Sequence, residues 1–273
     1  MSTPLQTRSQ LASQLRTLGV EAGDILEVHS SLRSLGKVVG GADAVVLALL
    51  EAASPGGTLV AIVSMHDNPY HLHDWPEERQ RAYRHELPAF DMARSTARSD
   101  HGFLAERIRT WPGAIRSTHP EAGVASIGEQ AAWIVSPHPD DFAYGHDTPF
   151  DRIKLAGGKV LMLGAPLGTI TMLHHAETIA DVPGKRLVSY QIPIDVDGES
   201  IWKSYRDIDS SSRGALPYSK MVPEGEDPFE FIAREALRSG IGRTGKVGLA
   251  DCYLFPAGAL VDFAVEWMQT QFA

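Results

Sequence analysis

The chain has 273 residues, 43% of them hydrophobic, which is enough for a sizeable buried core. It contains no apolar run of about 18 residues, and Met1 to Gln10 lack the apolar core of a signal peptide, so the sequence predicts a cytoplasmic protein that does not span a membrane. The formal net charge of −9 disfavours nucleic acid and favours a cationic ligand, while a single cysteine excludes an internal disulfide and a cysteine-only metal cluster.

Apolar strands and helices alternate at the start of the chain, which is typical of an α/β fold. The helices are recognised by leucine and alanine at helical spacing, and the strands by short apolar runs. The expected elements are a helix over 7–18 that ends at Gly19, a strand over 24–29, a loop over 30–41 rich in serine and glycine, a helix over 42–53 and a strand over 58–64.

This regular pattern is interrupted over residues 65–100, which are rich in histidine, proline and charge. A connection of this length is usually a functional lid or a disordered segment. Tyr70, Trp75, Tyr83 and Phe90 argue against disorder, so we expect an ordered, elaborated loop.

Regular elements return after residue 100. They are helices over 102–110 and 128–135, a strand over 159–163, a helix over 171–180, a hairpin of 186–194 and 199–205 around Asp197-Gly198, a helix over 227–238, a strand over 246–255 and a helix over 258–272. The sequence shows no internal repeat, and no clean linker divides these elements into two groups. The sequence therefore predicts one mixed α/β domain over residues 1–273.

Two motifs favour a structural interpretation. Gly240 to Gly245 match G-x-G-x-x-G, but this loop follows a helix and precedes a strand, the reverse of the dinucleotide fingerprint. A glycine-rich helix end is the better interpretation. Cys252 lies in an apolar strand and is expected to be a core residue, not a nucleophile.

The long loop contains a group of imidazoles and carboxylates, the side chains that could bind zinc. They are His66, Asp67, His71, His73, Asp74 and His85. No H-E-x-x-H or other tight ligand spacing is present. Solvated loop histidines are therefore favoured over a metal site.

The segment from His29 to Leu32 leaves the end of a strand and leads through Gly36, Gly40 and Gly41 into a helix. Small residues allow close approach of the backbone, and the helix start favours an anionic group. The arrangement suits a phosphate or a pantetheine arm, and an ordinary strand–helix turn fits it equally well.

The run Thr171 to Glu177 places His174 and Glu177 three positions apart, on one face of the predicted helix. A carboxylate beside an imidazole orients it and stabilises its protonated form, as in a general base with its partner. An ion pair on the helix surface is the alternative. His175 points about 100° away and is expected to pack in the core.

Several of these segments together resemble the aminoglycoside 3-N-acetyltransferase family. The resemblance covers nearly the whole chain, in the family's order, and is carried by HSSLRSLGKVVGG (29–41), PGGTLV (55–60), RSTHPEAGVASIG (116–128), GGKVLMLGAPLGTITMLHHAE (157–177) and DIDSSSRG (207–214). It implies a mixed α/β fold distinct from the usual small acetyltransferase fold. It also implies acetyl transfer from acetyl-CoA, without a metal, to the 3-amino group of a 2-deoxystreptamine antibiotic.

The resemblance implies roles for individual residues. His174 is the general base and Glu177 its partner. The residues expected along or near the acetyl-CoA arm are Ser30, Ser31, Leu32, Val38, Val39, Gly40, Ser117 and His119. Those expected near the cationic sugar are Asp67, Tyr70 and Asp209. Residues 67–70 contain one acid where relatives often have two, which bears on substrate affinity and breadth.

Two alternatives stay open: a zinc-dependent amide hydrolase that uses the histidine-rich loop, and a non-catalytic protein that binds cationic sugars. The expected partners are an aminoglycoside and acetyl-CoA, with no nucleic acid or membrane. The expected assembly is a monomer or a homodimer.

Overall fold

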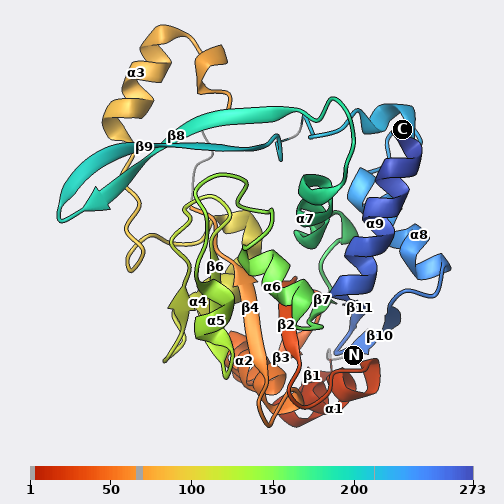
Figure 1. Cartoon of the computed structure of the whole chain (residues 1–273). Helices are drawn as coiled ribbons and strands as arrows, with labels where there is room; N and C mark the ends of the chain where they lie inside the picture. The colour runs from red at the N-terminus through yellow and green to blue at the C-terminus, as the bar shows by residue number, and fades with distance from the viewer. Residues whose placement is uncertain (1–3, 66–69, 212, 273) are drawn as a thin grey trace.

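A mixed sheet of seven strands forms the centre of the computed structural model, which describes residues 4–65, 70–211 and 213–272 (Figure 1). Its strands are β2 (Ile25–Ser30), β4 (Thr58–Ile62), β5 (Ile115–Arg116), β6 (Val124–Gly128), β7 (Lys159–Leu163), β10 (Arg243–Val247) and β11 (Ala250–Pro256). Their order across the sheet is β10-β11-β7-β2-β4-β6-β5. The central strand β2 runs parallel to β4 and β7, and the other neighbouring pairs are antiparallel. The carboxyl ends of β2, β4 and β7 therefore meet at one edge.

Helices cover both faces of the sheet, in the mixed α/β arrangement that the sequence predicts. The apolar cluster on one face includes side chains of α1 (Arg8–Leu18), α2 (Gly41–Ala52) and α4 (Gly102–Arg109). The cluster on the other face includes side chains of α5 (Ala131–Val135), α6 (Pro149–Leu155), α7 (Met172–Ile179), α8 (Pro228–Arg238) and α9 (Ala257–Gln271). A short parallel pair, β1 (Leu5–Gln6) and β3 (Lys37–Val38), lies outside the central sheet.

Local sequence explains where the helices begin and end. Thr7 and Gln10 form a capping box at the start of α1, and Gly19 ends that helix in the left-handed conformation, with φ of 117°. The Asp227 side chain accepts from the Glu230 N–H at the start of α8, and Pro228 occupies the first turn. These ends agree with the predicted ones to within a residue or two.

A long hairpin of β8 (Leu187–Val196) and β9 (Glu199–Ile208) crosses above the strand ends (Figure 1). Asp197 and Gly198 form its turn with φ of 53° and 87°, which confirms the predicted hairpin. The inner face of the hairpin packs against Tyr70 and Phe90 in a third apolar cluster, separate from the other two. The elaborated loop over residues 65–100 thus packs against the hairpin through these two aromatic side chains.

Several expected elements take a different form. The predicted strand over 246–255 is part of the hairpin β10–β11, which turns at Gly248 and Leu249. The predicted helix over 128–135 is the end of β6 followed by α5. The loop over 65–100 contains a helix, α3 (Glu77–Glu86), and α6 was not predicted.

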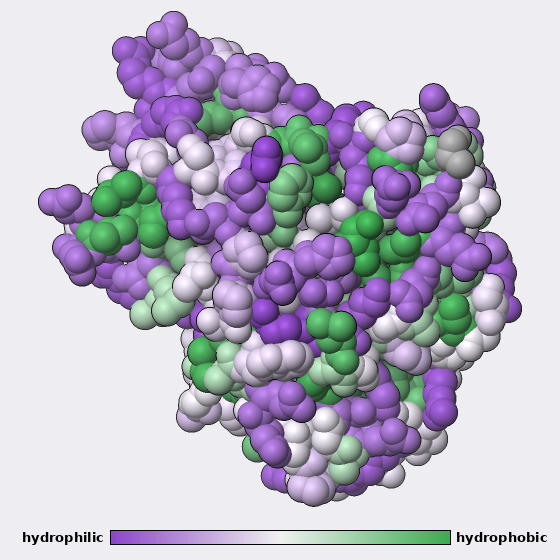
Figure 2. All heavy atoms as spheres, viewed as in Figure 1, coloured by the Kyte–Doolittle hydropathy of each residue, from purple (hydrophilic) through white to green (hydrophobic). Residues whose placement is uncertain are grey.

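The surface agrees with these assignments. Helix α3 has no buried residue, and the part of the surface where it projects is largely hydrophilic (Figure 2). Within the described ranges, we find no helix with the length and apolar character needed to cross a membrane.

Candidate active site

A cavity of about 490 Å³ opens at the carboxyl ends of the parallel strands. His29 and Ser30 of β2 and Ile62 of β4 contribute to its wall, and His174 contributes from α7. Ligands of α/β proteins bind at such a sheet edge, because loops and helix ends converge there.

The His174 imidazole is held by Glu177, one helical turn further on. His174 Nδ1 lies 2.7 Å from Glu177 Oε2, and the Glu177 side chain is 2% exposed. Because Nδ1–H donates to the carboxylate, Nε2 carries the lone pair. The rings of Tyr144 and Phe229 contact the imidazole, with centroids at 5.2 and 4.7 Å. His174 therefore has the form of a positioned general base.

Glu177 is itself fixed by a second donor, Tyr218, which the sequence did not indicate. The Tyr218 hydroxyl donates to Glu177 Oε1 at 2.7 Å. Burial, together with the neighbouring Glu177 carboxylate, holds the pKa of Tyr218 well above its usual range, so the phenol stays a donor. Tyr218 lies 41 positions away in the chain, and no local spacing could have connected the two.

Lys185 binds the C-terminal end of α7, the helix that carries His174 and Glu177. Its Nζ donates to the carbonyl oxygens of Glu177, Thr178 and Ala180 at 3.0, 2.8 and 2.5 Å. A cation at a helix C-terminus satisfies free carbonyls and complements the helix dipole. The position of Glu177 is thus fixed from the backbone side as well.

His175 and Cys252 lie in the core, as the sequence predicts. His175 is fully buried, and its Nδ1–H donates to the Tyr144 carbonyl at 2.6 Å. Burial lowers the pKa of this imidazole. Cys252 is buried in β11, and burial raises its pKa to about 11, which disfavours the thiolate that an acyl carrier would need.

The residues expected along the acetyl-CoA arm follow the chain from the cavity toward α2. Ser30 lines the cavity and is followed by Ser31, whose N–H donates to the Leu163 carbonyl at 3.0 Å. Leu32 packs against the α1–α2 side of the sheet. Val38, Val39 and Gly40 lead into α2, with Val39 53% exposed and Gly40 at φ of 84°.

Ser117 and His119, also expected near that arm, are 1% exposed and do not line the cavity. Ser117 Oγ accepts from the Val124 N–H at 3.0 Å, and His119 Nδ1 accepts from the N–H groups of Glu121 and Ala122. Burial lowers the pKa of His119 to about 4. They shape the segment that carries Glu121, and their contact with the cofactor stays a prediction.

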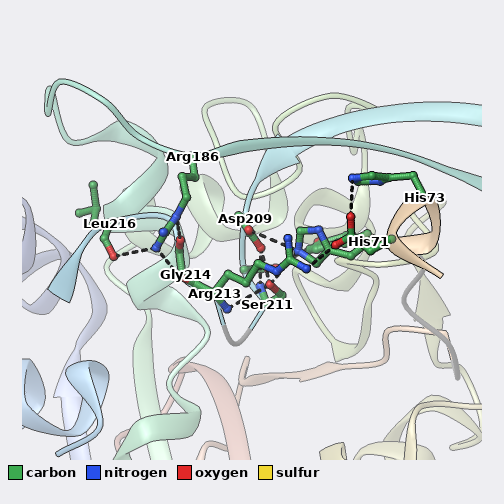
Figure 3. Close-up of polar contacts among 11 residues, drawn as sticks. His71, His73, Arg186, Asp209, Ser211, Arg213, Gly214 and Leu216 are labelled. Atoms are coloured by element: carbon green, nitrogen blue, oxygen red, sulfur yellow. Dashed lines mark hydrogen bonds and ion pairs between the residues drawn. The ribbon is translucent and has the colours of Figure 1, made fainter. Parts of the chain in front are cut away.

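Two of the residues expected near the sugar, Tyr70 and Asp209, lie beside the β8–β9 hairpin. Asp209 is 2% exposed, its Oδ1 accepts from the Ser211 hydroxyl at 2.5 Å, and its Oδ2 lies 3.4 Å from His71 Nε2 (Figure 3). The Tyr70 hydroxyl shares a hydrogen bond of 3.0 Å with Ser210. Ser210 and Ser211 themselves line the cavity. Asp67, with His66, lies outside the described residues.

Of the histidine-rich loop, His71, His73 and Asp74 come close enough to share an ion. Figure 3 shows Arg213 reaching toward this group, where its guanidinium pairs with Asp74. That pairing competes with a metal for the carboxylate, and His73 and Asp74 are exposed. His85 is exposed and pairs with Glu86, in agreement with the interpretation as solvated loop residues.

The cavity also contains acidic residues that the motifs did not single out as functional. Glu121 and Asp100 line it, with Arg98 between them at 3.7 and 2.8 Å. Asp207 is buried nearby, and burial raises its pKa to about 7. Glu121 lies inside RSTHPEAG, one of the segments that resemble the family, and this was the one sequence feature that pointed to a functional role for it.

A cavity of this size with a histidine–carboxylate pair on its wall is typical of an enzyme that acts on a small molecule. The family model described as aminoglycoside 3-N-acetyltransferase matches residues 28–269. The chain therefore belongs to the aminoglycoside 3-N-acetyltransferase family, and it is an acyltransferase.

Individual relatives agree with this assignment. The chain is 46% identical over 264 residues to aminoglycoside N(3)-acetyltransferase VII of Streptomyces paromomycinus, covering 96% of this chain and 91% of the relative. It is 45% identical to aminoglycoside N(3)-acetyltransferase IX of Micromonospora chalcea, with 97% and 94% covered. The crystal structure of aminoglycoside acetyltransferase AAC(3)-Xa superposes with a TM-score of 0.94 at 43% identity, over 98% of this chain and 94% of that one.

Proposed function

We propose that this protein transfers an acetyl group from acetyl-CoA to the 3-amino group of a 2-deoxystreptamine aminoglycoside, which would confer resistance to that antibiotic. The observation that carries the proposal is the His174–Glu177 pair on the cavity wall of a chain from this family. Two structural relatives support the two ligands. AAC-IIIb was solved as a binary complex with CoASH, and AAC-VIa was solved bound to sisomicin.

In this mechanism His174 Nε2 removes a proton from the amine as the nitrogen adds to the thioester carbonyl. Glu177 stabilises the imidazolium that forms, and Tyr218 keeps Glu177 in place. General-base catalysis contributes about 10² to 10⁴-fold, and holding both substrates in one complex adds to it. The amine is acetylated directly, without an acyl-enzyme.

The two substrates approach the cavity from different sides. We assign Ser30, Ser31 and Leu32, with Val38, Val39 and Gly40, to the acetyl-CoA arm, and Ser117 and His119 complete that region. Asp67, Tyr70 and Asp209 are assigned to the sugar side. Glu121 and Asp100 add negative charge inside the cavity, which favours the ammonium groups of an aminoglycoside.

The experiment is a thiol-release assay with acetyl-CoA and a panel of aminoglycosides, followed by NMR of the product. We expect release of CoA thiol and acetylation at the 3-amino group. Acetylation at the 2′ or 6′ amine would contradict the assignment. Loss of activity with a chelator would favour the zinc-dependent hydrolase, and stoichiometric binding without thiol release would favour a sugar-binding protein.

A further inference from the structure

The central strand carries a second histidine–carboxylate pair that the mechanism above does not use. Glu27 and His29 lie two positions apart on β2, so their side chains point to the same face of the sheet. His29 Nε2 is 3.6 Å from Glu27 Oε1. The Glu27 side chain is fully buried, whereas the His29 side chain is 10% exposed and lines the cavity.

Glu27 has no other partner among the described residues. Neither of its carboxylate oxygens makes a hydrogen bond there, and His29 Nε2 is likewise buried without one. Arg98 lines the same cavity, but its guanidinium is paired with Asp100 at 2.8 Å and with Glu121 at 3.7 Å. His29 is therefore the group that compensates the buried carboxyl.

Burial selects the charge state of such a pair, because net charge in a buried site is far costlier than a neutral pair. A buried carboxylate without a hydrogen-bond donor is compensated by a cation, and imidazolium is the cation that His29 supplies. An imidazolium carries a hydrogen on both ring nitrogens. Because Nε2 faces Glu27, Nδ1–H is the donor left for a ligand in the cavity.

We propose that His29 Nδ1–H donates a hydrogen bond to the carbonyl oxygen of the acetyl thioester, with Glu27 as the residue that positions it. This inference rests on the proposed function. His29 directly precedes Ser30, the first residue assigned to the acetyl-CoA arm, and His174 lines the same cavity from α7. One wall thus supplies a proton acceptor and the other a donor.

The two histidines then act on different atoms of one reaction. The amine nitrogen bonds to the carbonyl carbon as its proton passes to His174 Nε2, and the carbonyl π electrons move to the oxygen. That oxygen accepts the hydrogen bond from His29, which keeps its proton. The C=O double bond re-forms as the C–S bond breaks. His174 gives its proton to the sulfur, and CoA leaves as the thiol. Donors directed at the developing oxyanion stabilise the transition state more than the ground state.

A direct test is infrared spectroscopy of acetyl-CoA labelled with ¹³C at the acetyl carbonyl and bound to the wild-type protein without aminoglycoside. A hydrogen bond to the carbonyl lowers its stretching frequency, so we expect the bound band below the band in solution. We expect that shift to disappear in His29→Ala, to shrink in Glu27→Gln and to stay in His85→Ala. His85 with Glu86 is a matched histidine–carboxylate pair on the exposed surface.

Kinetics give the second measurement. Removal of one such donor costs about 10² to 10³-fold in kcat, so His29→Ala should lose that much while its Kd for CoA, which has no acetyl carbonyl, changes less than about 2-fold. An unshifted carbonyl band in the wild-type protein would overturn the proposal without any variant, as would a folded His29→Ala protein with near-normal kcat. A wild-type protein that neither binds acetyl-CoA nor releases thiol would instead contradict the proposed function.

Discussion

At the scale of single residues, the proposed chemistry depends on how rigidly the His174 imidazole is held. Glu177 contacts His174 with one oxygen and Tyr218 with the other, each at 2.7 Å. The sequence predicts the first contact, because residues three apart share a helix face. It could not predict the second, which depends on how α7 packs against a turn far along the chain.

The general base can be tested by removal. His174→Ala should lower kcat by about 10²-fold or more with the fold intact, because a general base supplies that order of rate. The measurement is steady-state thiol release, with circular dichroism to confirm folding and His85→Ala as the control on an exposed pair. Near-normal turnover would exclude His174 from the mechanism.

The partner of the base should have a smaller effect. Glu177→Gln keeps the shape but removes the charge that stabilises the imidazolium, so we expect kcat to fall by about 10-fold, less than in His174→Ala. Tyr218→Phe leaves the carboxylate in place and should lose still less. The pH–rate profile of Glu177→Gln should extend its active range to lower pH, and an unchanged profile would reduce Glu177 to a structural helix residue.

At the scale of elements, helix α7 carries the proposed base and its partner, so a change that loosens its C-terminal end should affect both activity and stability. Lys185 donates to three carbonyl oxygens at its end, and all of these bonds are lost in Lys185→Met. We expect this change to lower the free energy of unfolding by about 1–2 kcal/mol and to reduce kcat more than it raises KM. Lys246→Met, which removes an exposed lysine from its pair with Asp251, is the control and should change neither. Equal stability of the two variants would contradict the role of Lys185.

The elements also show which patterns a sequence reveals. Helices with caps, such as α1 and α8, and the hairpin turn at Asp197 and Gly198 are specified locally, and the sequence predicts them to within a residue. The turn between β10 and β11 is hidden inside an apolar run. Gly248 adopts φ of 59° there, and a Cβ on it would lie 2.5 Å from the Leu35 carbonyl oxygen. That requirement comes from tertiary packing, so periodicity did not show it.

At the scale of the whole molecule, the excess of negative charge should assist capture of a polycation. We expect KM for the aminoglycoside to rise with salt, because added ions shorten the distance over which charges attract, to about 8 Å at physiological ionic strength. KM for acetyl-CoA, an anion, should not rise with it for this reason. Steady-state kinetics at several ionic strengths measure both, and a constant aminoglycoside KM would contradict steering by the acidic protein.

Buried histidines should set the acid limit of folding. Burial lowers the pKa of His101 and of His119 to about 4, and it also lowers the pKa of His138 and His175. Between about pH 6.5 and pH 4 the unfolded chain binds more protons than the folded one, so stability falls as pH falls through that window. The lowered pKa of His119 alone should reduce the free energy of unfolding at pH 5 by about 2 kcal/mol relative to neutral pH.

Chemical denaturation at pH 7.5 and pH 5 measures this loss. His119→Gln should be less stable than the wild-type protein at pH 7.5 but should lose less stability on acidification. Equal pH dependence of the two proteins would contradict the assignment of His119.

The separate apolar cluster under the β8–β9 hairpin has a consequence for how such an enzyme can diversify. Tyr70 and Phe90 pack there with the hairpin, apart from the two clusters that hold α7 and the central sheet in place. In the proposed function this side faces the antibiotic, so substitutions here would alter the contacts to the sugar while His174, Glu177 and Tyr218 keep their geometry. Selection by a new aminoglycoside would then act on one part of the protein and leave the proposed transfer chemistry of the other part unchanged.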